Sequence, residues 1–267
     1  MFTPLIATDA ETMTPRTACL IAAIALLSVS LPAVAGDTDC KFGAERRGSI
    51  DTAGATRVEI FARAGDLTVK PATGATLSAG GRACASSQAF LDETQLHVRR
   101  DGDVVRVHVQ VPEKMQGIGV FYASLDLSVQ VPAGLAVDVT DSSGDLALED
   151  VRVARIQDSS GDILLRRTSG DVDVEDSSGD VRAEDVAGAV RVTDSSGDIV
   201  IRGAQSVHIP LDSSGDISID RVAGDVTIDR DSSGDVTVSN VGGNFELKAD
   251  GSGQVRVTGV KGEVRVP

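Results

Sequence analysis

The five-residue segment Asp-Ser-Ser-Gly-Asp occurs six times in the second half of this chain, at an almost constant interval. A degenerate seventh copy follows, and the glycines of the seven copies are Gly144, Gly161, Gly179, Gly197, Gly215, Gly234 and Gly253. Successive glycines are therefore 17, 18, 18, 18, 19 and 19 residues apart. Such a short, fixed period is typical of a solenoid, in which each repeat is one coil that buries its apolar face against its neighbours.

A second glycine near the middle of most repeats divides each coil into two short strands. In one coil, Ile163 and Leu165 occupy alternate positions before Gly170, and Val172 and Val174 do so after it. Alternation at period two places these side chains on one face of each strand, toward the interior. The sequence therefore predicts an all-β fold, a parallel β-helix with two flat sheets and about 18 residues per coil.

Charged residues one period apart fall into columns on the outer faces of the predicted sheets. The columns read Glu149, Arg166, Glu184, Arg202, Asp220; Asp150, Arg167, Asp185, Gly203, Arg221; and Arg155, Asp173, Arg191, His208. In stacked coils these neighbours lie about 4.8 Å apart, where opposite charges attract. A slip of one residue would break the columns and turn the valines outward, so the sequence specifies the register twice.

Residues 36–135 show strand signals without the regular repeat. Alternating or apolar runs predict strands over 58–61, 67–70, 96–99, 104–111 and 125–131, and no helix is predicted after the N-terminal apolar segment. We expect this part to form an irregular N-terminal β cap or opening coils, with the regular solenoid over residues 136–267. The segment Ala64-Gly65-Asp66-Leu67 is similar to the later turns. Pro210, which lacks a ladder N–H, predicts a local irregularity at a sheet edge or turn.

Residues 1–35 have the features of a cleaved secretory signal. Arg16 precedes an apolar run over 18–31, and the sequence Ala-Val-Ala ends at Ala35, just before Gly36. That order is typical of signal peptides, and the run is shorter than the roughly 20 residues of a membrane span. We predict cleavage between Ala35 and Gly36, an exported chain that is periplasmic or secreted, and no stable membrane insertion after the signal is removed.

Two cysteines, Cys40 and Cys84, remain after the predicted cleavage. An even pair in an oxidising compartment predicts a disulfide between them. Neither cysteine has a second metal ligand close by in the sequence, which disfavours a metal site.

The chain offers few residues in catalytic patterns. Its formal charge of −15 argues against nucleic-acid binding. The three histidines, His97, His108 and His208, lack zinc-ligand spacing, and no nucleophile elbow or phosphate-binding glycine loop is present. We therefore predict no catalytic residues and no cofactor, with calcium as the one open exception.

That exception arises from two aspartate columns in the repeated motif. The first, here called the inner aspartate column, comprises Asp141, Asp158, Asp176, Asp194, Asp212 and Asp231; the outer aspartate column comprises Asp145, Asp162, Asp180, Asp198, Asp216 and Asp235. Like charges at this spacing repel, so the arrangement requires an explanation. We favour a structural one: each inner aspartate accepts the N–H two residues on, and each outer aspartate ties the turn to the strand. The alternative is Ca²⁺ held by the inner column.

The tandem Asp-Ser-Ser-Gly-Asp coils, behind a signal peptide and an irregular first half, resemble a bacterial family of exported domains described as putative adhesins. The likeness covers about residues 50–267 and is strongest over 140–260. It implies a right-handed parallel β-helix exported across the inner membrane, with an adhesive or envelope-associated role. It implies no catalytic residue.

Three functional hypotheses follow. The leading one is a non-enzymatic exported solenoid whose flat sheets form a binding or structural surface for an envelope or surface protein or a glycan. The second is a calcium-binding β-roll. The third, a carbohydrate-active β-helix enzyme, lacks aromatic sugar platforms and a credible acid pair. The strand expected at 263–266 has no obvious cap, so end-to-end self-association stays open.

Overall fold

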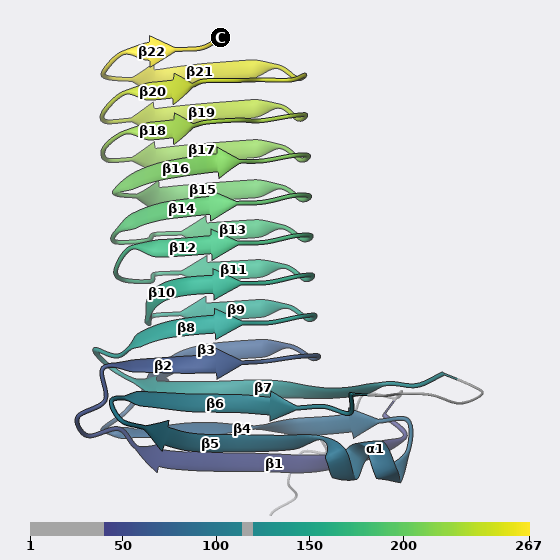
Figure 1. The fold of residues 1–267 in the computed structure, drawn as a ribbon. Coiled ribbons are helices and arrows are strands. Elements are labelled where there is room, and N and C mark those ends of the chain that lie inside the picture. Colours follow the sequence, from purple (N-terminus) through teal and green to yellow (C-terminus); the bar gives the residue numbers. More distant parts are fainter. Residues whose placement is uncertain (1–39, 114–119) are drawn as a thin grey trace, which may run out of the picture. The chain divides into compact units, whose positions relative to one another are not determined.

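The computed structural model of the protein describes residues 40–113 and 120–267. Within these residues, two sheets of eleven strands each lie face to face, and successive coils stack along one axis (Figure 1). The predicted all-β solenoid with two flat sheets is confirmed. The predicted signal peptide and its cleavage site between Ala35 and Gly36 lie outside the described residues.

One strand of every coil belongs to the first sheet. In spatial order it contains β1 (Phe42–Asp51), β4 (Thr76–Ala85), β7 (Ala123–Pro132), β3 (Leu67–Ala72), β9 (Leu146–Glu149), β11 (Ile163–Arg166), β13 (Val181–Glu184), β15 (Ile199–Ala204), β17 (Ile217–Val222), β19 (Val236–Val241) and β21 (Val255–Val260).

The other strand of every coil belongs to the second sheet. In spatial order it contains β5 (Gln95–Asp101), β6 (Val104–Gln110), β2 (Arg57–Phe61), β8 (Ala136–Thr140), β10 (Arg152–Gln157), β12 (Val172–Glu175), β14 (Ala189–Thr193), β16 (Ser206–Leu211), β18 (Val226–Ile228), β20 (Phe245–Leu247) and β22 (Val264–Arg265).

The interior consists of columns of aliphatic side chains from equivalent positions. Leu165 on β11 lies beside Leu148 on β9 and Ala183 on β13, in parallel register. All three side chains are fully buried. Each coil thus covers the apolar face of the next, which is how a chain with so few aromatic residues builds a core.

The first stacked coil comes from β2 and β3, because β8 pairs in parallel with β2, and β9 with β3. Below this coil, β6 and β7 still pair in parallel with β2 and β3. Antiparallel pairing begins with the next strands: β4 lies between β1 and β7 in one sheet, and β5 pairs with β6 in the other. These longer strands occupy the N-terminal end of both sheets (Figure 1). The turn at Gly65 belongs to the coil stack as predicted, since Gly65 donates its N–H to the carbonyl of Ser143 at 3.1 Å.

Three elements of the N-terminal part, β1, β4 and a helix, were not predicted from the sequence. Strands β1 and β4 are rich in glycine, alanine and arginine, so they lack the alternating large apolar residues that indicate a strand. The helix α1 (Gln88–Glu93) contradicts the expectation that no helix follows the signal. Its start is set by Ser87, whose hydroxyl accepts the N–H of Phe90.

Pro210 produces the predicted irregularity, but inside a strand and not at an edge or turn. It lies in β16, where the register against β14 shifts between Arg191 and Thr193. The partners there are His208 and Leu211, so β16 carries one extra residue. This is a β-bulge, the arrangement that lets a strand accommodate a residue without a ladder N–H.

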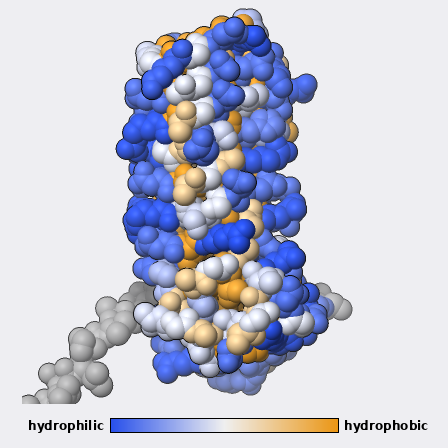
Figure 2. Space-filling model, turned by 90° about the vertical axis from the view of Figure 1, so that its left-hand side faces the viewer, coloured by the Kyte–Doolittle hydropathy of each residue, from blue (hydrophilic) through white to orange (hydrophobic). Residues whose placement is uncertain are grey.

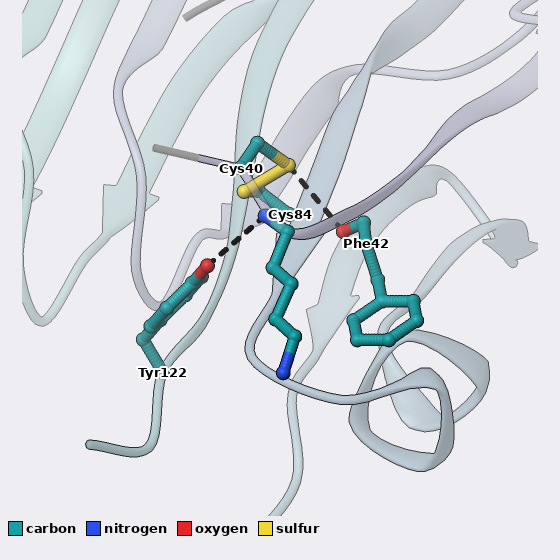
Figure 3. The surroundings of a disulfide bond; sticks show 5 residues. Cys40, Phe42, Cys84 and Tyr122 are labelled. Atoms are coloured by element: carbon teal, nitrogen blue, oxygen red, sulfur yellow. Dashed lines mark hydrogen bonds between the residues drawn. A yellow bond between two sulfur atoms is a disulfide. The ribbon is translucent and has the colours of Figure 1, made fainter. Parts of the chain in front are cut away.

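Cys40 and Cys84, which were predicted to pair, are joined by a disulfide with their Cα atoms 5.4 Å apart (Figure 3). The bond lies where β1 begins beside the end of β4. Next to it, the backbone N–H of Lys41 donates to the hydroxyl of Tyr122 at 3.1 Å (Figure 3). These contacts fasten the first described residues to the N-terminal sheet.

Removing this disulfide is expected to lower the free energy of unfolding by about 2–4 kcal/mol, because the bond closes a segment of 44 residues in the unfolded chain. The variant is Cys40→Ser/Cys84→Ser, which leaves no unpaired thiol at the site. Urea denaturation of the variant and of the oxidised wild type measures the difference. Equal denaturation midpoints would show that the bond contributes nothing to the stability of the fold.

The two edges of the solenoid differ in chemistry. Figure 2 shows the edge with the mid-coil turns, where a strip of small and apolar residues runs between hydrophilic flanks. Coils approach closely here: a Cβ added to Gly188 would lie 2.2 Å from the carbonyl oxygen of Gly170. Beneath the strip lie buried side chains that include Val186, Val222 and Val241. The repeated Asp-Ser-Ser-Gly-Asp motif forms the opposite edge.

Candidate functional site

The edge that carries the repeated motif is held together by its glycines. They adopt positive φ, for example +135° at Gly179 and +139° at Gly197, a conformation that residues with a side chain rarely adopt. The N–H of Gly179 donates to the carbonyl of Ser196 in the next coil at 3.0 Å. A Cβ on Gly197 would lie 1.9 Å from the carbonyl oxygen of Gly179. The turns therefore stack backbone on backbone, with no room for side chains.

The outer aspartate column forms hydrogen bonds between coils. The carboxylate of Asp180 accepts the backbone N–H of Asp198 at 2.9 Å, and Asp198 accepts that of Asp216 at 2.9 Å. The same bond recurs from Asp66 to Gln254. These aspartates therefore have a structural role, as the favoured explanation predicts, although their carboxylates bind the backbone of the following coil instead of tying the turn to its own strand.

Serine hydroxyls add a second row of bonds. The Ser196 hydroxyl donates to the backbone carbonyl of Ser177 at 3.2 Å, and Ser178 donates to the carbonyl of Ser159 at 3.1 Å. The second serine of one motif thus binds the backbone of the first serine one coil earlier. With the glycine and aspartate contacts, three kinds of hydrogen bond connect neighbouring turns.

The inner aspartate column lies on the other side of the turn and is buried. Its members are 0–6% exposed, and Asp194 and Asp212 are fully buried. The Oδ1 of Asp158 accepts the N–H of Ser159 at 2.8 Å, and Asp194 accepts from Ser195 at 2.7 Å and Ser196 at 3.3 Å. The predicted bond from the residue two positions on therefore forms at Asp194, whereas the shorter bond comes from the next residue.

Every inner aspartate has at least one buried carboxyl oxygen without a hydrogen-bond partner among the described residues. These oxygens are the Oδ2 atoms of Asp158, Asp176, Asp194 and Asp231, and both oxygens of Asp141 and Asp212. A buried, unpartnered carboxylate is costly, because it loses its hydration without a replacement. The structural explanation accounts for Oδ1 of Asp158, Asp176, Asp194 and Asp231 but leaves the unpartnered oxygens unexplained.

Burial raises the pKa of the inner aspartates. The pKa reaches about 6 at Asp141 and Asp194, and about 7 at Asp176 and Asp212. The cause is loss of water around the charged form, with a further contribution at Asp212 from the neighbouring carboxylates Asp231 and Asp194.

No group of three or more histidine, cysteine, aspartate or glutamate side chains is arranged to hold a metal ion in residues 40–113 and 120–267. Asp141, Asp158 and Asp176 line a surface hollow together with Gln157 and Glu175. Glu175 is already bound by Arg155 at 2.8 Å and by Gln157 at 2.9 Å. The inner aspartate column therefore places its carboxylates in a row. A calcium site requires several oxygen ligands around one point, and the column does not have that arrangement.

The charged columns follow the predicted register. Arg166 lies between Glu149 and Glu184, with nitrogen–oxygen distances of 3.3 and 3.1 Å. Arg167 pairs with Asp150 at 2.7 Å. The prediction of stacked, in-register coils is confirmed by these pairs.

The three histidines occupy outward positions on the second sheet. His208 contacts Arg191 at 3.2 Å and Asp229 at 2.9 Å, which makes it part of a charged column. His97 and His108 lie at the N-terminal end, where His108 contacts both His97 and Phe61, with ring centroids 6.3 and 6.1 Å apart. Their three strands, β5, β6 and β2, are adjacent, so the rings form one row across the sheet.

The ring row has cationic neighbours. The pKa of His108 is lowered, first by burial and then by Arg63, His97 and Arg99. A hollow beside the row is lined by Arg63, His108 and Gln110, among others. This combination of rings and hydrogen-bond donors was not predicted, because Phe61 lies on β2, far in the sequence from the β5–β6 hairpin that carries the two histidines.

The sequence did contain a signal for burial of the inner aspartates. Val172, Val174 and Asp176 occupy alternate positions, as do Val190, Val192 and Asp194, so each aspartate continues the inward face of its strand. Period-two alternation therefore separates the buried column from the outer one.

Comparison with known proteins identifies the family. A model of the family described as Toastrack DUF4097 matches residues 26–213, which is 188 of 267 residues. The chain belongs to the Toastrack family. The resemblance inferred from the repeated motif is confirmed at this level. The regular coils of this Toastrack member continue in the same register beyond the matched segment, through β17, β19 and β21.

Solved structures that are similar to this chain come from several bacteria. A putative cell adhesion protein from Clostridium sporogenes is 10% identical, with 84% of this chain and 100% of that chain covered and a TM-score of 0.39. A putative lipid binding protein from Parabacteroides distasonis is 13% identical, with 84% of this chain and 97% of that chain covered and a TM-score of 0.45. A putative adhesin from Bacteroides fragilis is 12% identical, with 84% of this chain and 97% of that chain covered and a TM-score of 0.36. No curated protein matches the sequence.

In the part of this Toastrack chain that the structure describes, no helix is long and apolar enough to span a membrane.

Proposed function

We propose that this Toastrack chain is an exported, non-enzymatic solenoid whose sheet faces serve as an adhesin-like binding surface in the cell envelope. The observation that carries the proposal is the ring row of Phe61, His108 and His97 at the N-terminal end of the second sheet. Rings with a polar edge combine apolar contact area with hydrogen bonding, which suits them to recognition of proteins and glycans. The disulfide between Cys40 and Cys84 supports export to an oxidising compartment.

The rest of the solenoid supports the row as a rigid scaffold. The outward charges of the coils pair with each other, as Arg166 does with Glu149 and Glu184. Exposed ion pairs of this kind contribute little to a partner's binding energy, since the charges already satisfy each other. Arg63, beside the ring row, has no ion pair among the described residues, and the same is true of Arg152 and Arg230 in the coils, so the rings and not a free charge distinguish this place. The row is therefore the place where we expect a partner to bind.

The test compares binding by the wild type and a Phe61→Ala/His108→Ala variant. The full chain is expressed with its N-terminal segment, purified from the envelope fraction and applied to a glycan array, and it is crosslinked in cells to recover protein partners. We expect a glycan or an envelope protein to be retained by the wild type and lost with the variant. The matched control is Thr227→Ala, which removes an outward side chain from β18 of the same sheet.

Three results would contradict the proposal. Retention of a partner by the double variant at wild-type strength would place binding elsewhere on the molecule. Recovery of nothing by the wild type, on the array and after crosslinking, would leave the chain without a binding function. Fractionation that finds the chain in the cytoplasm with free thiols at Cys40 and Cys84 would contradict export.

A further inference from the structure

The unexplained feature of the fold is the row of unpartnered oxygens in the inner aspartate column. Successive members occupy equivalent positions in consecutive coils, and isolated parallel bridges join Asp212 to Asp231 and Asp231 to Asp250 directly. Neighbouring coils are separated by about 4.8 Å, the spacing of hydrogen-bonded strands. The carboxyl groups therefore form a continuous buried file along the axis, with an unsatisfied oxygen in every coil.

The charged groups that face this file are acidic. Each inner aspartate has at least one neighbouring carboxylate whose negative charge raises its pKa. These neighbours are Asp158 and Asp66 for Asp141, Asp145 for Asp158, and Asp194 and Asp158 for Asp176. They are Asp180 for Asp194, Asp231 and Asp194 for Asp212, and Asp250 and Asp216 for Asp231. Glu175, at the rim of the hollow over the first three members, is paired with Arg155. None of the six inner aspartates forms an ion pair with a lysine, arginine or histidine of the described residues.

A buried carboxylate without a cation reaches a stable state by taking up a proton. Once protonated, a carboxyl group gains the O–H donor that the neighbouring unpartnered oxygen lacks. A hydrogen bond between a carboxylic acid and a carboxylate is charge-assisted and therefore strong. Protonation of some members thus satisfies the oxygens of the others.

We propose that the inner aspartate column is a proton-binding site, in which carboxyl groups of successive coils share protons taken from solvent and thereby join the coils. No metal is required, and the protons are released again when the chain unfolds. The raised pKa values of Asp141, Asp176, Asp194 and Asp212 agree with this assignment.

The consequence is a fold that becomes more stable as the pH falls from about 8 to about 5. The folded state binds more protons than the unfolded state, because the pKa of these aspartates is raised from 3.8 to about 6 or 7 on folding. Stability therefore falls as the pH rises through those values. His108, whose pKa is lowered, acts in the opposite direction, but it is one group against six.

The first experiment measures protonation directly. The full chain is labelled with ¹³C at the aspartate carboxyl carbons, and the chemical shifts are followed from about pH 8 to about pH 3. We expect a set of aspartate signals that titrate above pH 5, clearly separated from the remainder, and proton uptake by the folded chain over the same range. Titration of every aspartate below pH 5 would overturn the proposal.

The second experiment assigns the effect to the column. Asp194→Asn retains the acceptor for Ser195 and supplies an N–H donor that needs no proton, so the urea midpoint of this variant should exceed that of the wild type at pH 8 and change less between pH 8 and pH 5. The matched control, Asp198→Asn, removes the same charge four residues away in the outer column. Equal pH dependence of the two variants would show that net charge, and not the column, controls stability.

Calcium is tested in the same samples. At pH 8, the wild type is titrated with CaCl₂ and with NaCl at equal ionic strength. We expect the urea midpoint to respond equally to the two salts. A specific increase with calcium, lost in Asp194→Asn, would overturn the proposal and assign the column to a metal.

Discussion

Replacement of Gly197 by alanine is expected to lower the free energy of unfolding by at least about 3 kcal/mol and to divide the solenoid into two blocks that unfold separately. The added methyl group would lie 1.9 Å from the carbonyl oxygen of Gly179, far inside van der Waals contact. The methyl group is bonded directly to the Cα atom and the carbonyl is part of the backbone, so neither can move without separating the coils. The φ of +139° adds conformational strain for any residue with a Cβ.

The separation would break specific contacts. Between these two coils, Gly179 donates its N–H to the carbonyl of Ser196 at 3.0 Å, and the Ser196 hydroxyl donates to the carbonyl of Ser177 at 3.2 Å. Urea denaturation followed by circular dichroism measures both the midpoint and the steepness of the transition. The control is Gly102→Ala, at a turn with φ of +62° and open space around the position. There we expect the free energy of unfolding to fall by about 1–2 kcal/mol. Equal losses in the two variants would show that the stacked turns do not hold the coils together.

The regular coils could be predicted from the sequence because every structural requirement is repeated. Inward residues such as Val190 and Ile199, and outward charges such as Arg166, recur at one period, so each copy supports the same register. The N-terminal part offers no such repetition. The pairing of β1 with β4 depends on contacts between segments that have no common pattern, and its glycines and alanines are read as turns.

The candidate sites differ in the same way: those in the repeated coils could be predicted from the sequence, and the one in the N-terminal part could not. The outer aspartate column was predicted as structural, and its backbone contacts agree. Burial of the inner column could have been found from alternation with Val172 and Val174, but the charge of aspartate argued for an exposed position. The ring row of Phe61, His108 and His97 could not be found, because its members come together only through the pairing of β5, β6 and β2.

Replacement of Leu165 by alanine is expected to lower the free energy of unfolding by about 2–5 kcal/mol, the range for deletion of a buried leucine side chain. Leu165 is fully buried between Leu148 and Ala183. The solenoid interior is only two side-chain layers thick, so few neighbours can move to fill the cavity. Ala183 on one side is already small, which places the expected loss in the upper half of the range.

The adjacent residue supplies the control. Leu164 precedes Leu165 on the same strand, has the same side chain and points outward, where it is half-buried. Leu164→Ala should therefore cost less than about 1 kcal/mol in the same urea experiment, since little apolar area returns to water. A large difference between two neighbouring leucines is expected only if side chains alternate between core and solvent along β11. Equal losses would mean that β11 does not have this register.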